Sequence, residues 1–150
     1  MIEEGQAIIR ACLRLNRPGP YQIQAAINAV HADAASIEST DWSQILALYD
    51  QLLAMAPTPV VAMNRAIALA EVGGPEEALR ILDVLDLDLK EYHLFHAARA
   101  DFLRRLGRSD DAARAYARAA ALAESDVERA FLLGRLEAAR QRADRAPHAT

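Results

Sequence analysis

Two histidines lie close enough in the sequence to act on one ligand. His93 and His96 are three residues apart, so on a helix they would share one face. A zinc site, however, needs three or four converging ligands, and the chain holds a single cysteine, Cys12. Cys12 has only Arg10 and Arg14 nearby to activate its thiol. We therefore expect no metal site and no thiolate catalysis.

Motifs of other catalytic classes are absent from the sequence. It contains no glycine-rich phosphate loop, no serine–histidine–aspartate arrangement, and no carboxylate pair in a pocket-like context. Tyr21 and Trp42 stand near expected helix starts, where they are better explained as packing anchors than as stacking platforms for a ligand. The sequence favours a protein that is not an enzyme and that uses no cofactor.

One set of polar residues recurs at a fixed interval. His31, Arg65 and Arg99 are evenly spaced along the chain, at a position between neighbouring helices. Guanidinium groups persist there only when they are paired and hydrogen-bonded. This stripe could bind acidic or backbone groups of a partner, or it could form an internal ladder of ion pairs, which is the interpretation we prefer. The carboxylates expected on the same helices are Asp33, Glu71 and Asp101.

The same spacing, here called the repeat interval, relates apolar positions. Residues of similar class recur 34 positions apart in an order typical of the tetratricopeptide repeat (TPR), a helical hairpin of this length. In that pattern a glycine ends the first helix, and an alanine lets the second helix pack closely against it. A divergent repeat precedes the two clear ones. The matching residues are Ala66, Leu69, Gly73, Ala78, Leu82 and Leu85, followed by Ala100, Leu103, Gly107, Ala112, Tyr116 and Ala119.

Start and stop signals divide the chain into helices. Capping side chains are expected at Asp41, Thr58, Asp88 and Ser125. The predicted helices span about 2–16, 21–34, 41–55 and 59–72, one starting at Pro75, one over about 89–106, and two starting at Ser109 and Ser125. We predict an all-α fold, a right-handed α-solenoid of about eight helices. Its single domain, residues 1–140, comprises TPR-like hairpins over 2–34, 41–72, 75–106 and 109–140, followed by a disordered tail over 141–150.

Composition and charge narrow the function classes. The 150 residues are 53% hydrophobic and 25% charged, which is typical of one soluble globular domain. The net charge of −4 divides into −6 for residues 1–90 and +2 for residues 91–150, so neither part offers the clustered positive charge that nucleic-acid binding needs. No apolar run approaches the roughly 20 residues of a membrane span. With one cysteine and no basic leader, we expect a cytoplasmic protein that binds neither nucleic acid nor membrane.

A TPR array binds peptides or proteins along the first helices of its hairpins. In this register the concave positions include Val60, Met63 and Ile67, then Leu94, Ala97 and Asp101, which make the groove apolar. An apolar segment or amphipathic helix, possibly from the same polypeptide, is therefore the expected ligand. The candidate partner-binding residues are Tyr21, Gln24, His31, Val60, Met63, Asn64, Arg65, Ile67, Tyr92, Leu94, His96, Arg99 and Asp101.

Several short strings are more specific than the repeat. They include Gly19-Pro20-Tyr21-Gln22-Ile23-Gln24-Ala25-Ala26-Ile27, Asn64-Arg65-Ala66, and Tyr92-His93-Leu94-Phe95-His96-Ala97-Ala98-Arg99-Ala100. Over about residues 2–138 the chain resembles the C-terminal, TPR-containing extension of bacterial ECF-type RNA polymerase sigma factors. The chain itself contains no sigma region 2, no sigma region 4 and no helix-turn-helix motif.

The resemblance implies a regulatory module that modulates transcription initiation. Its expected partners are sigma regions 2 and 4 of the same polypeptide, core RNA polymerase, or both. Two alternatives stay open. The chain could be a freestanding TPR adaptor that joins unrelated proteins, or a sensor whose groove binds a small apolar or anionic metabolite.

Overall fold

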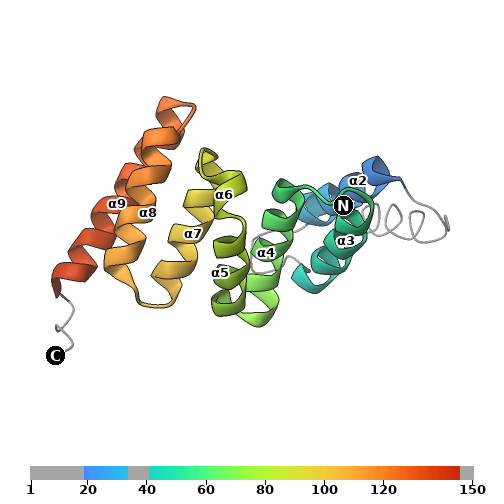
Figure 1. The fold of residues 1–150 in the computed structure, drawn as a ribbon, viewed down its shortest axis with the longest axis horizontal. Coiled ribbons are helices and arrows are strands. Elements are labelled where there is room, and N and C mark those ends of the chain that lie inside the picture. Colours follow the sequence, from blue (N-terminus) through green and yellow to red (C-terminus); the bar gives the residue numbers. More distant parts are fainter. Residues whose placement is uncertain (1–18, 34–40, 146–150) are drawn as a thin grey trace. The chain divides into compact units, whose positions relative to one another are not determined.

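A computed structural model describes residues 19–33 and 41–145, and every regular element in these ranges is an α-helix (Figure 1). The prediction of an all-α chain is confirmed for the described residues, in which no strand occurs. None of the helices searched there combines the length and the apolar character needed to cross a membrane. In chain order the helices are α2 (Pro20–Asp33), α3 (Trp42–Met55), α4 (Pro59–Gly73), α5 (Pro75–Val84), α6 (Asp86–Leu89), α7 (His93–Arg105), α8 (Ser109–Leu122) and α9 (Asp126–Arg145).

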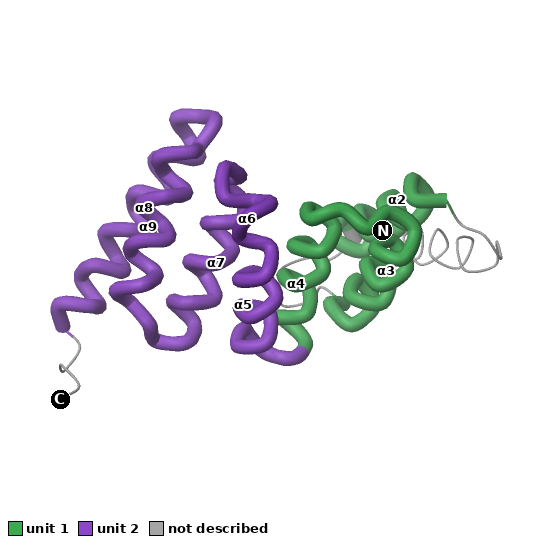
Figure 2. Tube along the Cα trace, in the orientation of Figure 1, with its two compact units in different colours: residues 1–72 green, residues 73–150 purple. Residues whose placement is uncertain are grey.

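The contacts divide the chain into two compact units (Figure 2). The N-terminal unit, residues 1–72, contains α2, α3 and nearly all of α4, and the C-terminal unit, residues 73–150, contains α5 to α9. The expected single domain over residues 1–140 stays a prediction. The expected helix over 2–16, together with Cys12, lies outside the described residues.

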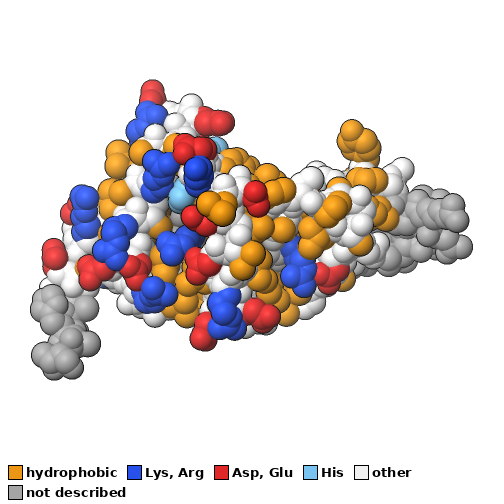
Figure 3. All heavy atoms as spheres, viewed as in Figure 1, with side chains coloured by type: hydrophobic (Ala, Val, Ile, Leu, Met, Phe, Trp, Pro, Cys, Tyr) orange, Lys and Arg blue, Asp and Glu red, His pale blue; other side chains and the backbone are white. Residues whose placement is uncertain are grey.

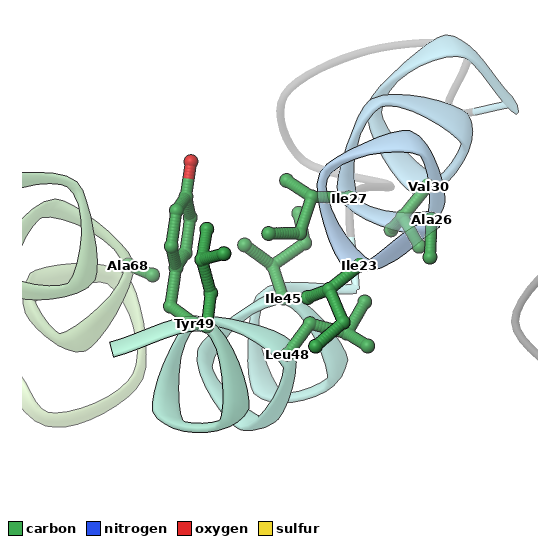
Figure 4. Packing of buried hydrophobic residues seen from close by; sticks show 9 residues of the cluster. Ile23, Ala26, Ile27, Val30, Ile45, Leu48, Tyr49 and Ala68 are labelled. Carbon is green, nitrogen blue, oxygen red and sulfur yellow. The ribbon is translucent and has the colours of Figure 1, made fainter. Parts of the chain in front are cut away.

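The core of the N-terminal unit lies between α2 and α3 (Figure 4). Ile23 and Ile27, one helical turn apart on α2, point toward Ile45 and Leu48 of α3, and all four are buried. Removing such side chains from water stabilises the fold by about 1.5–3 kcal/mol each. Ala68 of α4 extends the same cluster.

Three helices begin at side-chain caps that the sequence predicts. Asp41 Oδ1 accepts a hydrogen bond from the Gln44 backbone N–H at 3.1 Å, before α3. Thr58 Oγ1 accepts one from Val61 at 3.2 Å, and Ser125 Oγ accepts one from Glu128 at 3.1 Å. Each cap satisfies one of the backbone donors that a helix leaves unpaired in its first turn.

In the C-terminal unit each longer helix packs against its neighbours in the sequence. The pairs in contact are α5 with α7, α7 with α8, and α8 with α9. The buried residues recur at intervals of three and four, as expected for one face of each helix. The largest contributors are Leu82 of α5, Phe95, Phe102 and Leu103 of α7, Tyr116 of α8, and Leu132 and Leu136 of α9.

Gly107 ends α7 as predicted, and its backbone explains why. Its φ is +77°, a conformation that residues with a Cβ rarely adopt. The Gly107 N–H donates to the Arg104 carbonyl at 3.0 Å, and the Arg108 N–H donates to the Leu103 carbonyl at 2.9 Å. This pair of bonds is the Schellman motif, which satisfies carbonyls at the end of a helix. In the preceding repeat the positive φ belongs to Gly74 and not to Gly73, which is helical.

Two boundaries differ from the prediction. The helix expected over 89–106 with Asp88 as its cap is wrong, because Asp88 lies within α6 and α7 begins only at His93. The single turn of α6 closes when the Leu85 carbonyl accepts bonds from Asp88 and Leu89, and Leu89 is buried.

The C-terminal helix is also longer than expected. Residues 141–145, predicted to belong to a disordered tail, continue α9 to Arg145. Gln141 bonds back to Glu137 and Arg145 bonds back to Gln141, each at 3.4 Å. These side-chain hydrogen bonds between residues four positions apart stabilise the end of α9, where the apolar periodicity has ended. Residues 146–150 lie outside the described part of the chain.

Candidate partner-binding surface

The two arginines of the evenly spaced stripe each pair with a carboxylate on the preceding long helix. Arg65 of α4 forms an ion pair with Asp50 of α3 in the N-terminal unit. Arg99 Nε of α7 donates to Asp83 Oδ1 of α5 at 3.2 Å in the C-terminal unit. In both pairs the arginine is about a third exposed and the aspartate about half exposed. This is the arrangement expected of an internal ladder that repeats from hairpin to hairpin.

Neither aspartate is predicted from the sequence as a partner of the stripe. Asp50 and Asp83 precede their arginines by 15 and 16 residues, so the spacing between the two aspartates is one position short of the repeat interval. That near-repeat was a usable signal. Asp101, which was expected to serve the stripe, accepts instead from two arginines of its own helix, Arg104 at 2.6 Å and Arg105 at 2.9 Å.

Asp101 belongs to a polar cluster between α7 and α8. Its hydrogen bond to Arg104 raises the pKa of that guanidinium, burial opposes the shift, and a hydrogen bond with Tyr116 of α8 adds to it. Arg104 Nε is buried without a hydrogen-bond partner. The cluster therefore joins two helices, and Asp101 is engaged inside the C-terminal unit.

The third member of the stripe, His31, lies on the surface of α2. Its ring meets that of Trp42 edge to face, with the ring centroids 5.3 Å apart. Trp42 in turn packs against the core between α2 and α3, as expected of a packing anchor. Tyr21 differs from that expectation, because 90% of its surface is exposed.

His93 and His96 have separate partners. Both rings are buried, yet His93 Nε2 lies 2.6 Å from Glu128 Oε1, while His96 Nε2 lies 2.7 Å from the Lys90 carbonyl oxygen. Among the described residues, no three histidine, cysteine or acidic side chains gather as metal ligands would. His93 fastens α7 to α9, and His96 fastens α7 to the turn after α6.

The remaining candidates differ in exposure. Met63 is 2% exposed, so it belongs to the core, as does His96. Asn64, Ile67 and Tyr92 are half-buried. Gln24 is half-buried as well and is engaged by Asn28 and by Tyr49 of α3. Burial raises the pKa of the Tyr49 hydroxyl, and the Gln24 hydrogen bond opposes that shift.

Three apolar candidates on the surface occupy the same place in their helices. Tyr21, Val60 and Leu94 are the second residues of α2, α4 and α7, and Val60 and Leu94 are also separated by the repeat interval. Val60 is 39% exposed and Leu94 is 43% exposed. The described residues thus present an exposed apolar side chain at the start of each of these three helices.

The charged side chains of the C-terminal unit have no single sign. On the face drawn in Figure 3, acidic and basic side chains are interspersed over the C-terminal unit. Ion pairs between residues close in the sequence also occur in this unit, such as those of Asp111 with Arg108 and Arg114. A surface of this kind favours an apolar contact surrounded by mixed charges over the recognition of a polyanion.

Comparisons with known proteins provide one relative. The chain is 44% identical over 137 residues to an uncharacterized protein of Rhizobium meliloti (strain 1021), a match that covers 91% of this chain and 32% of the relative. The chain thus spans about a third of the length of that curated relative. No protein-family model matches the chain. No solved structure matches it either.

Proposed function

We propose that this chain is the regulatory, protein-binding module of an ECF-type RNA polymerase sigma factor, built as an α-solenoid of TPR-like hairpins. The observation that carries the modular role is that nearly the whole chain aligns with only a third of a longer relative. The assignment to sigma factors rests on the strings around Tyr21, Asn64 and Tyr92 that resemble the extension of those proteins.

Three structural repetitions support the TPR-like arrangement. The pairs Arg65–Asp50 and Arg99–Asp83 connect successive long helices in the same way. Gly74 and Gly107 supply left-handed residues between helices. The alanines predicted to allow close packing, Ala78 and Ala112, are both fully buried. Each feature recurs at the repeat interval or one position short of it, in line with the repeat in the sequence.

The partner would dock on exposed apolar residues at helix starts, on Tyr21 and Val60 in the N-terminal unit and, separately, on Leu94 in the C-terminal unit. A segment that covers them must itself be apolar, such as the apolar face of an amphipathic helix. Sigma regions 2 and 4 and core polymerase are the proposed sources of that segment. Regulation would follow from a shift between docked and released populations, driven by whatever binds one of them more tightly.

A binding experiment tests the proposal directly. The full chain is titrated with the sigma regions encoded by the same gene, and affinity is measured for the wild type and for Val60→Glu and Leu94→Glu. We expect each charge at the apolar contact to weaken binding about tenfold or more, which corresponds to roughly 1.4 kcal/mol. Val72→Glu is the matched control, because Val72 is an exposed valine at the opposite end of α4 from Val60.

Two results would overturn the proposal. One is the absence of binding to the sigma regions and to core polymerase at high micromolar concentration. The other is unchanged reporter transcription when the segment is deleted from the full-length protein. Binding of an unrelated protein in place of the sigma regions would favour a freestanding adaptor.

A further inference from the structure

The outward face of α9 is apolar although the helix already has a packed face. Leu132, Leu136 and Ala139 are buried against the rest of the C-terminal unit. On the other side of the same helix, Val127 is 83% exposed and Phe131 is 60% exposed. Their neighbours on that side, at spacings of three and four residues, are small and exposed. The outward stripe consists of Val127, Ala130, Phe131, Gly134 and Ala138.

The face of a surface helix that turns away from the core ordinarily carries charged and polar residues. None of the five residues of the outward stripe is polar. The guanidinium of Arg135 lies over the Phe131 ring, 5.2 Å from its centroid, and shields only part of it. The exposed ring is therefore the centre of an apolar surface flanked by alanines and a glycine.

Gly134 is a second, independent sign that something approaches this face. It lies within α9, where glycine is less favourable than alanine because it loses more backbone freedom on folding. Its backbone has no positive φ that would require glycine, and a Cβ built on it meets no atom within 4 Å. Nothing in the described chain explains the missing side chain, whereas a helix packed closely from outside would need that space.

We propose that the outward stripe of α9 pairs with the same stripe of a second copy of this chain, with the two helices antiparallel. The charges at the ends of α9 select this orientation. Its first turn carries the fully exposed Asp126 together with Glu128, which already bonds to His93, and its last turn carries Arg142 and Arg145. Antiparallel packing brings the acidic turn of each copy to the basic turn of the other and opposes the two helix dipoles. A parallel pair would bring like charges together.

The pairing is self-complementary, so it closes at two copies. In it the Phe131 ring of each copy would enter the space left by Gly134 and Ala138 of the other. One helix pair makes a small interface, and we expect a reversible dimer with a dissociation constant in the micromolar range. The outward stripe shares no residue with Tyr21, Val60 and Leu94, and the pairing requires no sigma region.

Analytical ultracentrifugation of the full chain alone, from low micromolar to millimolar concentration, tests the proposal. We expect a concentration-dependent monomer–dimer equilibrium. Phe131→Glu and Gly134→Leu should each raise the dissociation constant at least tenfold with unchanged helical circular dichroism. Leu87→Glu is the control, because Leu87 is as exposed as Val127 but lies on α6.

Orientation is tested by disulfide trapping in a Cys12→Ser background. Gly134→Cys lies near the crossing point of the proposed pair and should form a dimer-linking disulfide, whereas Val127→Cys, toward one end, should not link to its own copy. A chain that stays monomeric at millimolar concentration overturns the proposal. So does a dimer that Phe131→Glu and Gly134→Leu leave intact, or one that Val127→Cys links efficiently. No sigma region is present, so these outcomes are independent of the docking experiment.

Discussion

His93 Nε2 on α7 lies 2.6 Å from Glu128 Oε1 in the first turn of α9, and this contact joins two helices that α8 separates in the sequence. The main helix contacts of the C-terminal unit join helices that follow one another, apart from the short α6. The His93 side chain is 9% exposed, so little water competes for the bond. The start of α9 is thereby held from two directions, by Glu128 and by the Ser125 cap.

Loss of this contact should destabilise the C-terminal unit. We expect His93→Ala and Glu128→Ala each to lower the free energy of unfolding by about 1–3 kcal/mol, since a partly buried charged hydrogen bond is lost. Urea unfolding of the two single variants and the double variant would give the coupling energy. Glu124→Ala, at an exposed position before α9, should change little. A coupling energy near zero would contradict the assigned contact.

The repeated arginine–aspartate pairs should matter less for stability than their regularity suggests. Each is well exposed to solvent, so we expect Arg65→Ala and Arg99→Ala to cost below about 1 kcal/mol and to retain helicity. Thermal unfolding monitored by circular dichroism measures this, with Arg80→Ala of the exposed Arg80–Glu76 pair as control. Unfolding of either variant at room temperature would show that the ladder is essential to the fold. Weaker sigma-region binding by a stable variant would instead assign that arginine to the docking surface.

Asp111 should make stability depend on pH in the acidic range. Burial favours its neutral form, but hydrogen bonds and charges from Arg108 and Arg114 outweigh it and lower the pKa of the carboxyl. The pKa of Asp111 is lower in the folded chain than in the unfolded chain. Its contribution to the free energy of unfolding is therefore complete above the unfolded-state pKa of about 4, and it is lost as the pH falls through the folded-state pKa.

We therefore expect Asp111→Asn to be less stable than the wild type near neutral pH and to approach it as the solution is acidified below about pH 4. Urea unfolding over a pH series provides the comparison. Asp110→Asn provides the control for removing an exposed acidic side chain from the first turn of α8. A constant difference between wild type and Asp111→Asn at all pH values would refute the assignment.

Ala112 should tolerate no larger side chain. It is fully buried on α8, one of the two positions where the repeat requires a small residue. We expect Ala112→Leu to lower the free energy of unfolding by about 1–3 kcal/mol through overpacking. Ala121→Leu provides the control, because Ala121 is exposed on the same helix. Equal melting temperatures for the two variants would show that α8 has room to move outward and accommodate the larger side chain.

Helix starts could be predicted from the sequence where a capping side chain bonds to the backbone only three residues later. Asp41, Thr58 and Ser125 each accept from the backbone N–H three positions later, a contact contained within the local sequence. The start of α7 could not be predicted in this way, because it depends on tertiary packing. The short helix α6 ends at Leu89, which is buried, and the residue before α7, Tyr92, is extended and makes no side-chain cap.

Only part of the candidate surface could be predicted, because sequence spacing identifies single residues but not their partners on other helices. The repeat interval identified Arg65 and Arg99, but their partners Asp50 and Asp83 lie on other helices and are fixed by how those helices pack. Exposure also had to come from the structure. Val60 and Met63 belong to the same predicted groove, yet one lies on the surface and the other in the core.

The preference of the C-terminal helices for their sequence neighbours also has a kinetic consequence. Contacts between successive helices close short loops, so little chain entropy is lost before they form, and folding of this unit should take microseconds to milliseconds. Its slowest native contact should be the one between His93 and Glu128, which must wait until α8 has docked on α7. In stopped-flow refolding, Glu128→Ala should therefore accelerate unfolding while leaving the folding rate nearly unchanged.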